Sequence, residues 1–423
     1  MKRLIYILLD GVGDKPDPEL NWITPLEAAH TPQLDSLARG GISGLVYPVG
    51  KDIPPESDIA VFHMLGYNFK EGYAGRGVIE AVGAGLSFED GNLAIRANFA
   101  TIDKHEIIMD RRVGRNLSSE EAKKLATSIN KYVKLSYPKT TLNFVSTVAH
   151  RAVLVIKVEN MRLSSNISNS DPAYLRLKGV GVAKVRKEEE VLKLEKVQAL
   201  DEKSETQLSA NLVNEFTEKS IGLLKEHPVN VKRDEKGEMP ANAILLRDAG
   251  NSLPRLEKLN EKYGLSFVCI LDMPVERGIA RLTGMVEVES GGIEDYELKA
   301  EKTAKLLDRY DCVYVHIKGP DEPGHDGDAI RKKKVIENID SKFFNNLLEY
   351  IDLNEVVIAV SADHSTPCQL KSHSADPVPI LISGKSITND GTCRFTEKEA
   401  AKGSLKILKG YQVLPLIISL AKK

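Results

Sequence analysis

Seven residues spread along the chain are of the types that bind metal ions and transfer phosphoryl groups: Asp10, Ser57, Asp321, His325, Asp363, His364 and His373. The three carboxylates among them follow runs of apolar and β-branched residues at 4–9, 313–317 and 356–360. Such runs are typical of buried strands, and ligands of open α/β sheets bind beyond the carboxyl ends of the strands. We therefore expect these carboxylates at strand ends, where a ligand would bind.

A single aspartate after a strand is often only a turn former or the N-cap of the next helix. Here the pattern is repeated: Asp321 and His325 are spaced to bind one ion from a turn, and His364 and His373 follow Asp363 closely. Carboxylates combined with imidazoles suit Mn²⁺, Co²⁺ or Zn²⁺, whereas Mg²⁺ and Ca²⁺ prefer oxygen ligands. The number of potential ligands exceeds the number that one tetrahedral ion needs, so we predict two divalent ions. We expect Mn²⁺ in preference to Co²⁺ or Zn²⁺.

The serine lies where a short helix is expected to begin. Residues 54–66 contain two prolines, Ser57, an apolar stretch and a terminal glycine, which is the pattern of a loop followed by a capped helix. Ser57 could serve only as the N-cap. A helix N-terminus also favours anions, and a hydroxyl beside a cation can lose its proton and attack phosphorus. We therefore predict that Ser57 is both cap and nucleophile.

The order of these residues resembles that of the alkaline phosphatase superfamily, and the surrounding segments resemble the archaeal type of cofactor-independent phosphoglycerate mutases. The matching segments extend from the first predicted strand to residue 379 and cover residues 7–14, 75–81, 98–101, 316–327 and 372–379. The resemblance implies a reaction in which the serine takes the phosphoryl group from one hydroxyl of glycerate and returns it to the other. The result is the interconversion of 3-phosphoglycerate and 2-phosphoglycerate, and no 2,3-bisphosphoglycerate is needed.

The same resemblance implies a division of the ligands between two ions. One ion would be held by Asp321, His325 and His373. The other would be held by Asp10, Asp363, His364 and the oxygen of Ser57.

Strand-like and helical patterns alternate at both ends of the chain, for example in the helical patterns at 296–310 and 329–350. This alternation predicts an α/β fold, an alkaline phosphatase-like sheet with helices on both faces. The middle block mixes further predicted strands with a helix and contains none of the metal-ligand candidates. We predict a metal-binding phosphatase domain at 1–70 and 241–423, and an inserted α+β transferase domain at 71–240 that acts as a lid.

Arginine binds oxyanions in a bidentate manner that lysine cannot reproduce, so basic residues were considered as substrate ligands. His150, Arg151 and Asp171 lie where the resembling mutases carry the insert residues that hold glycerate. Further candidates for substrate binding are Arg247, Arg281 and Lys318. The basic run at 331–334 is instead expected to form a solvated helix face.

Composition excludes several classes of partner. The net charge is −2 and the pI is about 6.5, so we expect neither nucleic acid nor an anionic membrane as a partner. The apolar run at 413–421 is too short to span a bilayer, no signal peptide is recognisable, and a cytoplasmic location is expected. The cysteines lack paired spacing, which predicts reduced thiols, and Cys368 is expected to be a loop thiol rather than a ligand. The sequence does not indicate an oligomeric state.

Two alternatives remain at this stage. A metal-dependent phosphomonoesterase, phosphodiesterase or phosphopentomutase would use the same metal core, and only the insert distinguishes it from a mutase. A catalytically silent metal-binding or scaffolding module would be expected to lack members of the seven-residue set, and none is missing.

Overall fold

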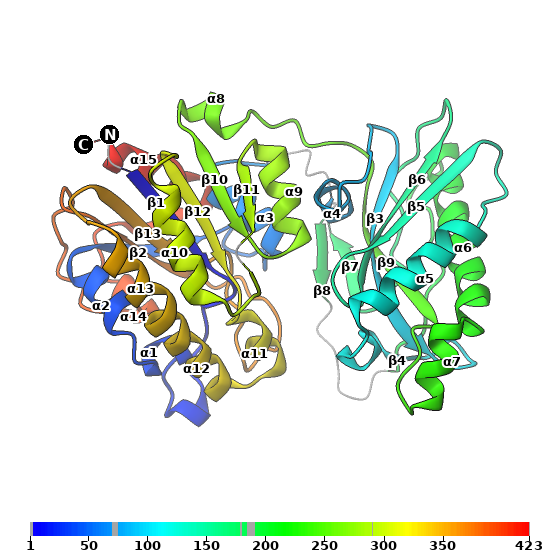
Figure 1. The fold of residues 1–423 in the computed structure, drawn as a ribbon, viewed down its shortest axis with the longest axis horizontal. Coiled ribbons are helices and arrows are strands. Elements are labelled where there is room, and N and C mark those ends of the chain that lie inside the picture. Colours follow the sequence, from blue (N-terminus) through cyan, green and yellow to red (C-terminus); the bar gives the residue numbers. More distant parts are fainter. Residues whose placement is uncertain (1–2, 70–74, 178–179, 184–190, 290, 423) are drawn as a thin grey trace. The chain divides into compact units, whose positions relative to one another are not determined.

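A computed structural model describes residues 3–69, 75–177, 180–183, 191–289 and 291–422. The chain divides into two compact units (Figure 1). Unit 1 comprises residues 1–70, 256–272 and 283–423, and unit 2 comprises residues 71–255 and 273–282. No helix within the described ranges is long and apolar enough to cross a membrane.

Unit 1 is built on an eight-stranded sheet with the order β11-β10-β12-β1-β13-β14-β2-β15. Its strands are β1 Arg3–Leu9, β2 Gly41–Tyr47, β10 Phe267–Leu271, β11 Val286–Glu289, β12 Cys312–Ile317, β13 Val356–Ser361, β14 Val378–Ser383 and β15 Lys406–Lys409. The three central strands β12, β1 and β13 run parallel, with Ile7 paired to Val315 on one side and to Val360 on the other. Their carboxyl ends therefore meet at one edge of the sheet.

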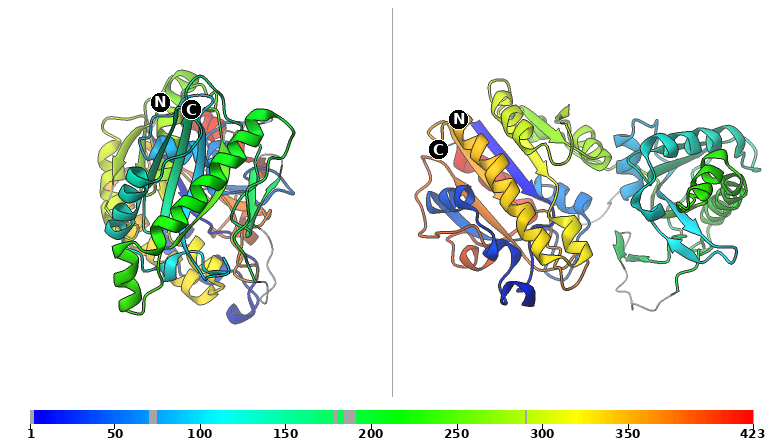
Figure 2. Two further views of the ribbon diagram at one scale, coloured as in Figure 1. Left: turned by 90° about the vertical axis from the view of Figure 1, so that its right-hand side faces the viewer. Right: turned by 60° about the horizontal axis from the view of Figure 1, so that its bottom comes forward.

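Helices cover both faces of this sheet, as Figures 1 and 2 show. The long helix predicted at 329–350 consists of two α-helical segments joined by one π turn. Together with α10 it lies on one face, whereas α15 contacts β1 and β13. The helices of this unit are α1 Pro25–Ala28, α2 Pro32–Arg39, α3 Ser57–Met64, α8 Leu259–Tyr263, α10 Tyr296–Leu306, α11 Asp321–Asp326, α12 Ala329–Ile339, the π turn Asp340–Phe344, α13 Asn345–Tyr350, α14 Glu397–Ala400 and α15 Gly410–Ala421. The predicted α/β fold is confirmed.

Unit 2 contains a separate antiparallel sheet in which β3 pairs with both β6 and β9. Its elements are β3 Leu93–Ile102, β4 Ile108–Asp110, β5 Thr140–Ser146, β6 Arg151–Val158, β7 Tyr174–Leu177, β8 Val180–Ala183, β9 Ala243–Gly250, α4 Arg76–Gly83, α5 Ser119–Tyr132, α6 Ser204–Lys225, α7 Pro228–Glu235 and α9 Pro274–Thr283. Alternate residues of β3 such as Leu93, Ile95 and Phe99 pack into a core with α5 and α6. Ala94 points to the opposite face, where it packs with α4, because successive side chains of a strand alternate between faces.

Two segments expected in the metal-binding domain lie in unit 2 instead. Strand β9 belongs there because it pairs with β3 along its length. Helix α9 packs against α4 so closely that a Cβ atom on Gly278 would lie 2.0 Å from the carbonyl oxygen of Ile79, and one on Gly83 would lie 2.0 Å from that of Pro274. Such contacts between distant segments leave no signal in local sequence patterns.

Candidate active site

The structure brings six of the predicted ligands together as two clusters in unit 1. The first ligand cluster consists of Asp321, His325 and His373, and the second consists of Asp10, Asp363 and His364. In each cluster one ligand atom per residue lies within 4.8 Å of the others. The rings of His364 and His373 stack with their centroids 3.8 Å apart, so the two clusters are neighbours.

In the first ligand cluster, Asp321 and His325 lie one turn apart on α11 and His373 comes from the loop after β13. The Nδ1 atoms of His325 and His373 lie 3.1 and 2.8 Å from backbone carbonyl oxygens. A carbonyl only accepts, so both Nδ1 atoms donate and the Nε2 atoms are left to face a ligand. These Nε2 atoms are 3.2 Å apart, and each is 3.5 Å from Asp321 Oδ1.

Three electron-rich atoms that converge in this way require a positive charge between them. Burial lowers the pKa of His373, but its hydrogen bond and ion pair with Asp321 outweigh this effect and raise the pKa to about 10. A divalent cation fits the same position, because two imidazoles and a carboxylate form a common ligand set for Mn²⁺, Co²⁺ or Zn²⁺.

The second ligand cluster is buried at the ends of β1 and β13. His364 Nε2 lies 3.4 Å from Asp10 Oδ1 and 3.3 Å from Asp363 Oδ2. These two carboxylate oxygens accept no hydrogen bond from the described residues. Because buried carboxylate oxygens are costly to leave without a partner, they fit a bound cation.

An ammonium group and an imidazole lie beside the second ligand cluster. Lys318 Nζ is 3.0 Å from Asp10 Oδ2, and His316 Nε2 is 3.4 Å from Asp363 Oδ2. Burial raises the pKa of Asp10, but the positive charge of Lys318 opposes this effect, and the pKa lies well below its usual value. Lys318 is thus the predicted substrate ligand that the structure places beside the clusters.

Ser57 lies at the beginning of α3 with its Oγ 3.1 Å from His364 Nε2. The prediction that Ser57 is the N-cap was wrong, because the cap is Glu56 and Ser57 is the first helical residue. This shift by one position leaves the hydroxyl without a capping role and directed at the second ligand cluster.

The basic candidates His150, Arg151 and Arg247 lie in unit 2 with Asp171, together with arginines that the sequence analysis did not select. The register of the sheet pairs Arg96 with Arg247 and Asn98 with Arg151, so these side chains share the face that carries α4. Like charges placed opposite each other destabilise a sheet. Their presence on neighbouring strands therefore indicates a function that needs positive charge.

Acidic residues partly neutralise this arginine face. Asp171 pairs with Arg247 at 3.3 Å and also with Arg111 in a bidentate manner, and Glu80 pairs with Arg76 and Arg96 at 2.9 and 3.3 Å. Within the described ranges Arg151 forms no ion pair with an acid, and its Nη1 lies 3.9 Å from Met273 Sδ.

The excess charge is reflected in neighbouring pKa values. Burial lowers the pKa of His150 to about 3, with further contributions from Arg151 and Arg112. Burial is the main cause that lowers the pKa of Arg96 to about 10, and the positive charges of Arg247 and Arg76 lower it further. This face of unit 2 is therefore suited to bind an anion.

Arg281 has a different environment. Its Nη1 donates to the carbonyl oxygens of Val82 and Gly83 at 2.7 and 3.3 Å. These are the last carbonyls of α4, which have no partner within the helix. Arg281 therefore closes the C-terminus of α4.

The expectation that residues 331–334 form a solvated face was wrong for Lys332. This side chain is fully buried, and its Nζ donates to Asp14 Oδ2 at 2.8 Å and to the carbonyls of Gly13 and Thr366 at 3.1 and 2.9 Å. It thus connects α12 with the loops that follow β1 and β13. Helical periodicity directs one member of the basic run inward, and only the packing of α12 shows which one.

Replacing Lys332 by methionine should destabilise unit 1 by about 3–5 kcal/mol, because Asp14 would remain as a buried charge without its partner. Urea unfolding at constant pH measures the loss. Lys333→Met is the matched control, since Lys333 is partly exposed and makes only a 3.6 Å pair with Glu337, and it should cost less than about 1 kcal/mol. Equal stability of the two variants would contradict the role of Lys332 as the buried partner of Asp14.

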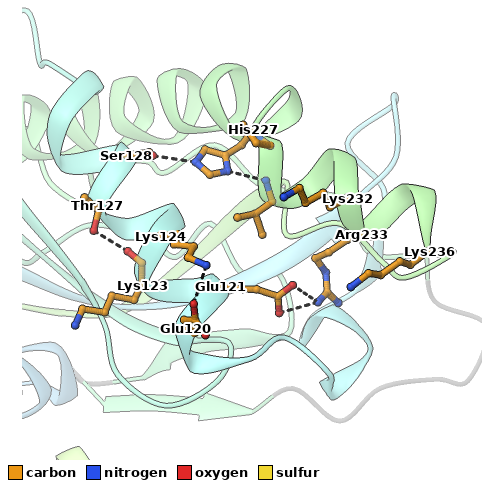
Figure 3. A pocket seen from close by; sticks show the side chains of 12 residues that line it. Glu120, Glu121, Lys123, Lys124, Thr127, Ser128, His227, Lys232, Arg233 and Lys236 are labelled. Carbon is orange, nitrogen blue, oxygen red and sulfur yellow. Dashed lines mark hydrogen bonds and ion pairs between the residues drawn. The ribbon is translucent and has the colours of Figure 1, made fainter.

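A cleft of about 690 Å³ lies between α5 and α7 of unit 2 (Figure 3). Ser128 Oγ points to His227 Nε2 at 2.9 Å, which resembles a serine with its general base. His227 Nδ1, however, accepts a hydrogen bond from the backbone N–H of Val229 at 3.2 Å. The proton of the neutral ring is therefore on Nε2, which donates to Ser128, so His227 cannot accept the hydroxyl proton. This pair is not an activated nucleophile.

Comparison with known proteins adds an independent finding. Residues 38–230 match the family model of 2,3-bisphosphoglycerate-independent phosphoglycerate mutase. A protein of this name from Aeropyrum pernix is 42% identical over 429 residues and covers 99% of both chains. One from Methanocaldococcus jannaschii is 37% identical over 423 residues, with 99% of this chain and 97% of that protein covered.

Two solved structures are similar over the whole chain. A Pyrococcus horikoshii protein has a TM-score of 0.79 at 31% identity, with 100% of this chain and 97% of that chain covered. A cofactor-independent phosphoglycerate mutase from Thermoplasma acidophilum has a TM-score of 0.63 at 33% identity and covers 100% of both chains.

Proposed function

The chain belongs to the 2,3-bisphosphoglycerate-independent phosphoglycerate mutase family, and we propose that it interconverts 3-phosphoglycerate and 2-phosphoglycerate through a phosphoserine at Ser57. The observation that carries this proposal is the position of Ser57 Oγ, 3.1 Å from His364 in a cluster of buried metal-ligand candidates. The interconversion is shared by glycolysis and gluconeogenesis, and we propose that it occurs in the cytoplasm.

In this proposal each ligand cluster holds one divalent cation, Mn²⁺ in the first instance, with Co²⁺ or Zn²⁺ as alternatives. Asp321, His325 and His373 hold one ion. Asp10, Asp363 and His364 hold the other together with the Ser57 oxygen. Bound cations would stabilise the negative charge of the phosphoryl oxygens and favour the alkoxide form of the serine.

The residues of the chain then perform two matched transfers. The Ser57 oxygen forms a bond to phosphorus while the bond from phosphorus to the oxygen at C3 of glycerate breaks, and that oxygen takes up a proton. Lys318 neutralises charge on the phosphoryl group. After glycerate has reoriented, the C2 oxygen attacks the phosphoserine, loses its proton and frees Ser57, so the overall reaction consumes no water and releases no phosphate.

Unit 2 supplies glycerate binding in this proposal. The carboxylate of glycerate needs bidentate donors, which arginines provide, and its hydroxyls need acceptors such as Asp171. We propose that His150, Arg151, Asp171 and Arg247 hold the glycerate and that unit 2 acts as the lid that excludes water while the phosphoserine persists. Arg281, which closes the end of α4, is proposed to support this surface rather than to contact substrate.

Arg151→Ala tests the proposal that unit 1 transfers the phosphoryl group while unit 2 holds the glycerate. Isomerisation should fall by about 10²-fold, because glycerate would be held less firmly during reorientation. Attack on a generic ester such as p-nitrophenyl phosphate should fall far less, and phosphate release per turnover should rise. Formation of 2-phosphoglycerate and inorganic phosphate are measured side by side with Mn²⁺ present.

Lys157→Ala is the matched control, since Lys157 lies on the same strand but is exposed and pairs with Glu89. It should leave both reactions unchanged. Equal losses of both reactions in Arg151→Ala would refute the lid assignment. Predominant phosphate release by the unmodified protein would instead favour a phosphatase.

A further inference from the structure

We infer that Thr366 is a positioning residue that joins the two ligand clusters and fixes the ring tautomer of His364. The inference rests on the proposed function in one respect, because it concerns residues proposed to hold metal ions. Thr366 lies in the loop after β13, two residues beyond His364, and is fully buried.

The hydroxyl of Thr366 contacts one residue of each ligand cluster. Its Oγ1 donates to Asp321 Oδ1 at 2.7 Å, and it lies 3.0 Å from Nδ1 of His364. Asp321 belongs to the first cluster and His364 to the second. A single hydroxyl therefore connects the first ligand cluster with the second.

The direction of these two hydrogen bonds follows from proton counting. A threonine hydroxyl has one proton, and an ionised carboxylate can only accept, so the Thr366 proton is directed to Asp321. The Thr366 oxygen must then accept from His364, which places the ring proton on Nδ1. The Nε2 lone pair of His364 is thereby directed to Ser57, Asp10 and Asp363, the side on which a metal ligand is required.

The backbone around Thr366 holds the hydroxyl in this position. Its N–H donates to the carbonyl of Gly13 at 3.0 Å, and its carbonyl accepts from Lys332 Nζ at 2.9 Å. A Cβ atom on Gly11 would lie 2.6 Å from Thr366 Oγ1, and one on Gly324 would lie 2.5 Å from the Thr366 carbonyl oxygen. A glycine in the loop after β1 and a glycine in α11 thus make room for Thr366, and the segments after β1, β12 and β13 converge on it.

Thr366→Val tests this role, because valine keeps the shape of the side chain and removes only the hydroxyl. The dissociation constant for Mn²⁺, measured by calorimetric titration of the metal-stripped protein, should rise by about 10–100-fold, as is usual when a group that orients a metal ligand is lost. Thr366→Ser restores the hydroxyl and should bind Mn²⁺ with nearly the affinity of the unmodified protein. With saturating Mn²⁺, kcat should recover more than the affinity does.

Thr303→Val is the matched control for the loss of a buried hydroxyl. Thr303 is also fully buried in unit 1, but its Oγ1 donates to the Lys299 carbonyl within α10. Its variant should lose similar stability in urea unfolding and bind Mn²⁺ unchanged. Weaker binding in both valine variants would assign the effect to general destabilisation and overturn the inference.

A second readout requires no metal. Nitrogen-15 NMR of the metal-stripped protein, labelled at histidine, should show His364 protonated at Nδ1 in the unmodified protein and in Thr366→Ser, with this tautomer depleted in Thr366→Val. An unchanged tautomer together with unchanged Mn²⁺ affinity in Thr366→Val would overturn the inference. Failure of the unmodified protein to bind Mn²⁺ would overturn the proposed function, and the tautomer would then decide this inference alone.

Discussion

Ser57→Ala should reduce the interconversion of the phosphoglycerates by about 10³-fold or more, because the group proposed to accept the phosphate would be absent. The phosphorylated protein should disappear as well. Turnover is measured from 3-phosphoglycerate with Mn²⁺ and without bisphosphoglycerate. The covalent phosphate is measured by mass spectrometry of acid-quenched protein, which should carry it on the peptide containing Ser57 in the unmodified protein alone.

The fold of this variant should be preserved. Ser57 is the first residue of α3 and makes no capping hydrogen bond, so its loss should change stability by no more than about 0.5 kcal/mol. Ser128→Ala is the control, since Ser128 also contacts a histidine but accepts a hydrogen bond from it. It should retain full activity. Substantial turnover in Ser57→Ala would show that the nucleophile lies elsewhere.

Removal of divalent cations should abolish activity, since two clusters of carboxylates and imidazoles would repel the phosphoryl group without them. Mn²⁺ or Co²⁺ should restore activity better than Ca²⁺, which prefers more oxygen ligands at longer distances. The same cations should stabilise unit 1 against unfolding, by about 2.7 kcal/mol at a concentration 100 times the dissociation constant. Activity and thermal unfolding are followed during chelation and re-addition.

His325→Ala separates a specific metal effect from a general one. It removes one imidazole of the first ligand cluster, so it should lower both metal affinity and activity. His105→Ala is its control, because His105 is an exposed residue of unit 2, and it should change neither quantity. Full activity of the metal-stripped protein would refute both the metal assignment and the proposed reaction.

The ligand types and their place in the chain could be predicted because they depend on local pattern. Apolar runs at 4–9, 313–317 and 356–360 became β1, β12 and β13, and the aspartates follow these strands. The types of adjacent residues indicate whether a segment forms a buried strand. The sequence also predicted α10 within a few residues, since helical periodicity is equally local.

Which strands are neighbours was decided by tertiary structure alone. The order β12-β1-β13 brings together segments more than 300 residues apart in sequence, and long-range pairing has no local signal. The sheet register of unit 2 likewise placed Arg96 opposite Arg247. Alternation along β3 could have suggested that Arg96 and Ala94 share a face, but the partner strand could not be read from the chain.

The sequence by itself therefore determined the chemistry of this protein, namely the acids, imidazoles and serine and the strands that carry the acids. The tertiary structure decided how these groups are oriented. The hydroxyl of Thr366 and the ammonium of Lys332 are ordinary polar groups in the sequence, and they gain importance only where the segments after β1, β12 and β13 meet. Hydrogen bonds extend only about 3 Å, so such roles exist only after distant segments have packed together.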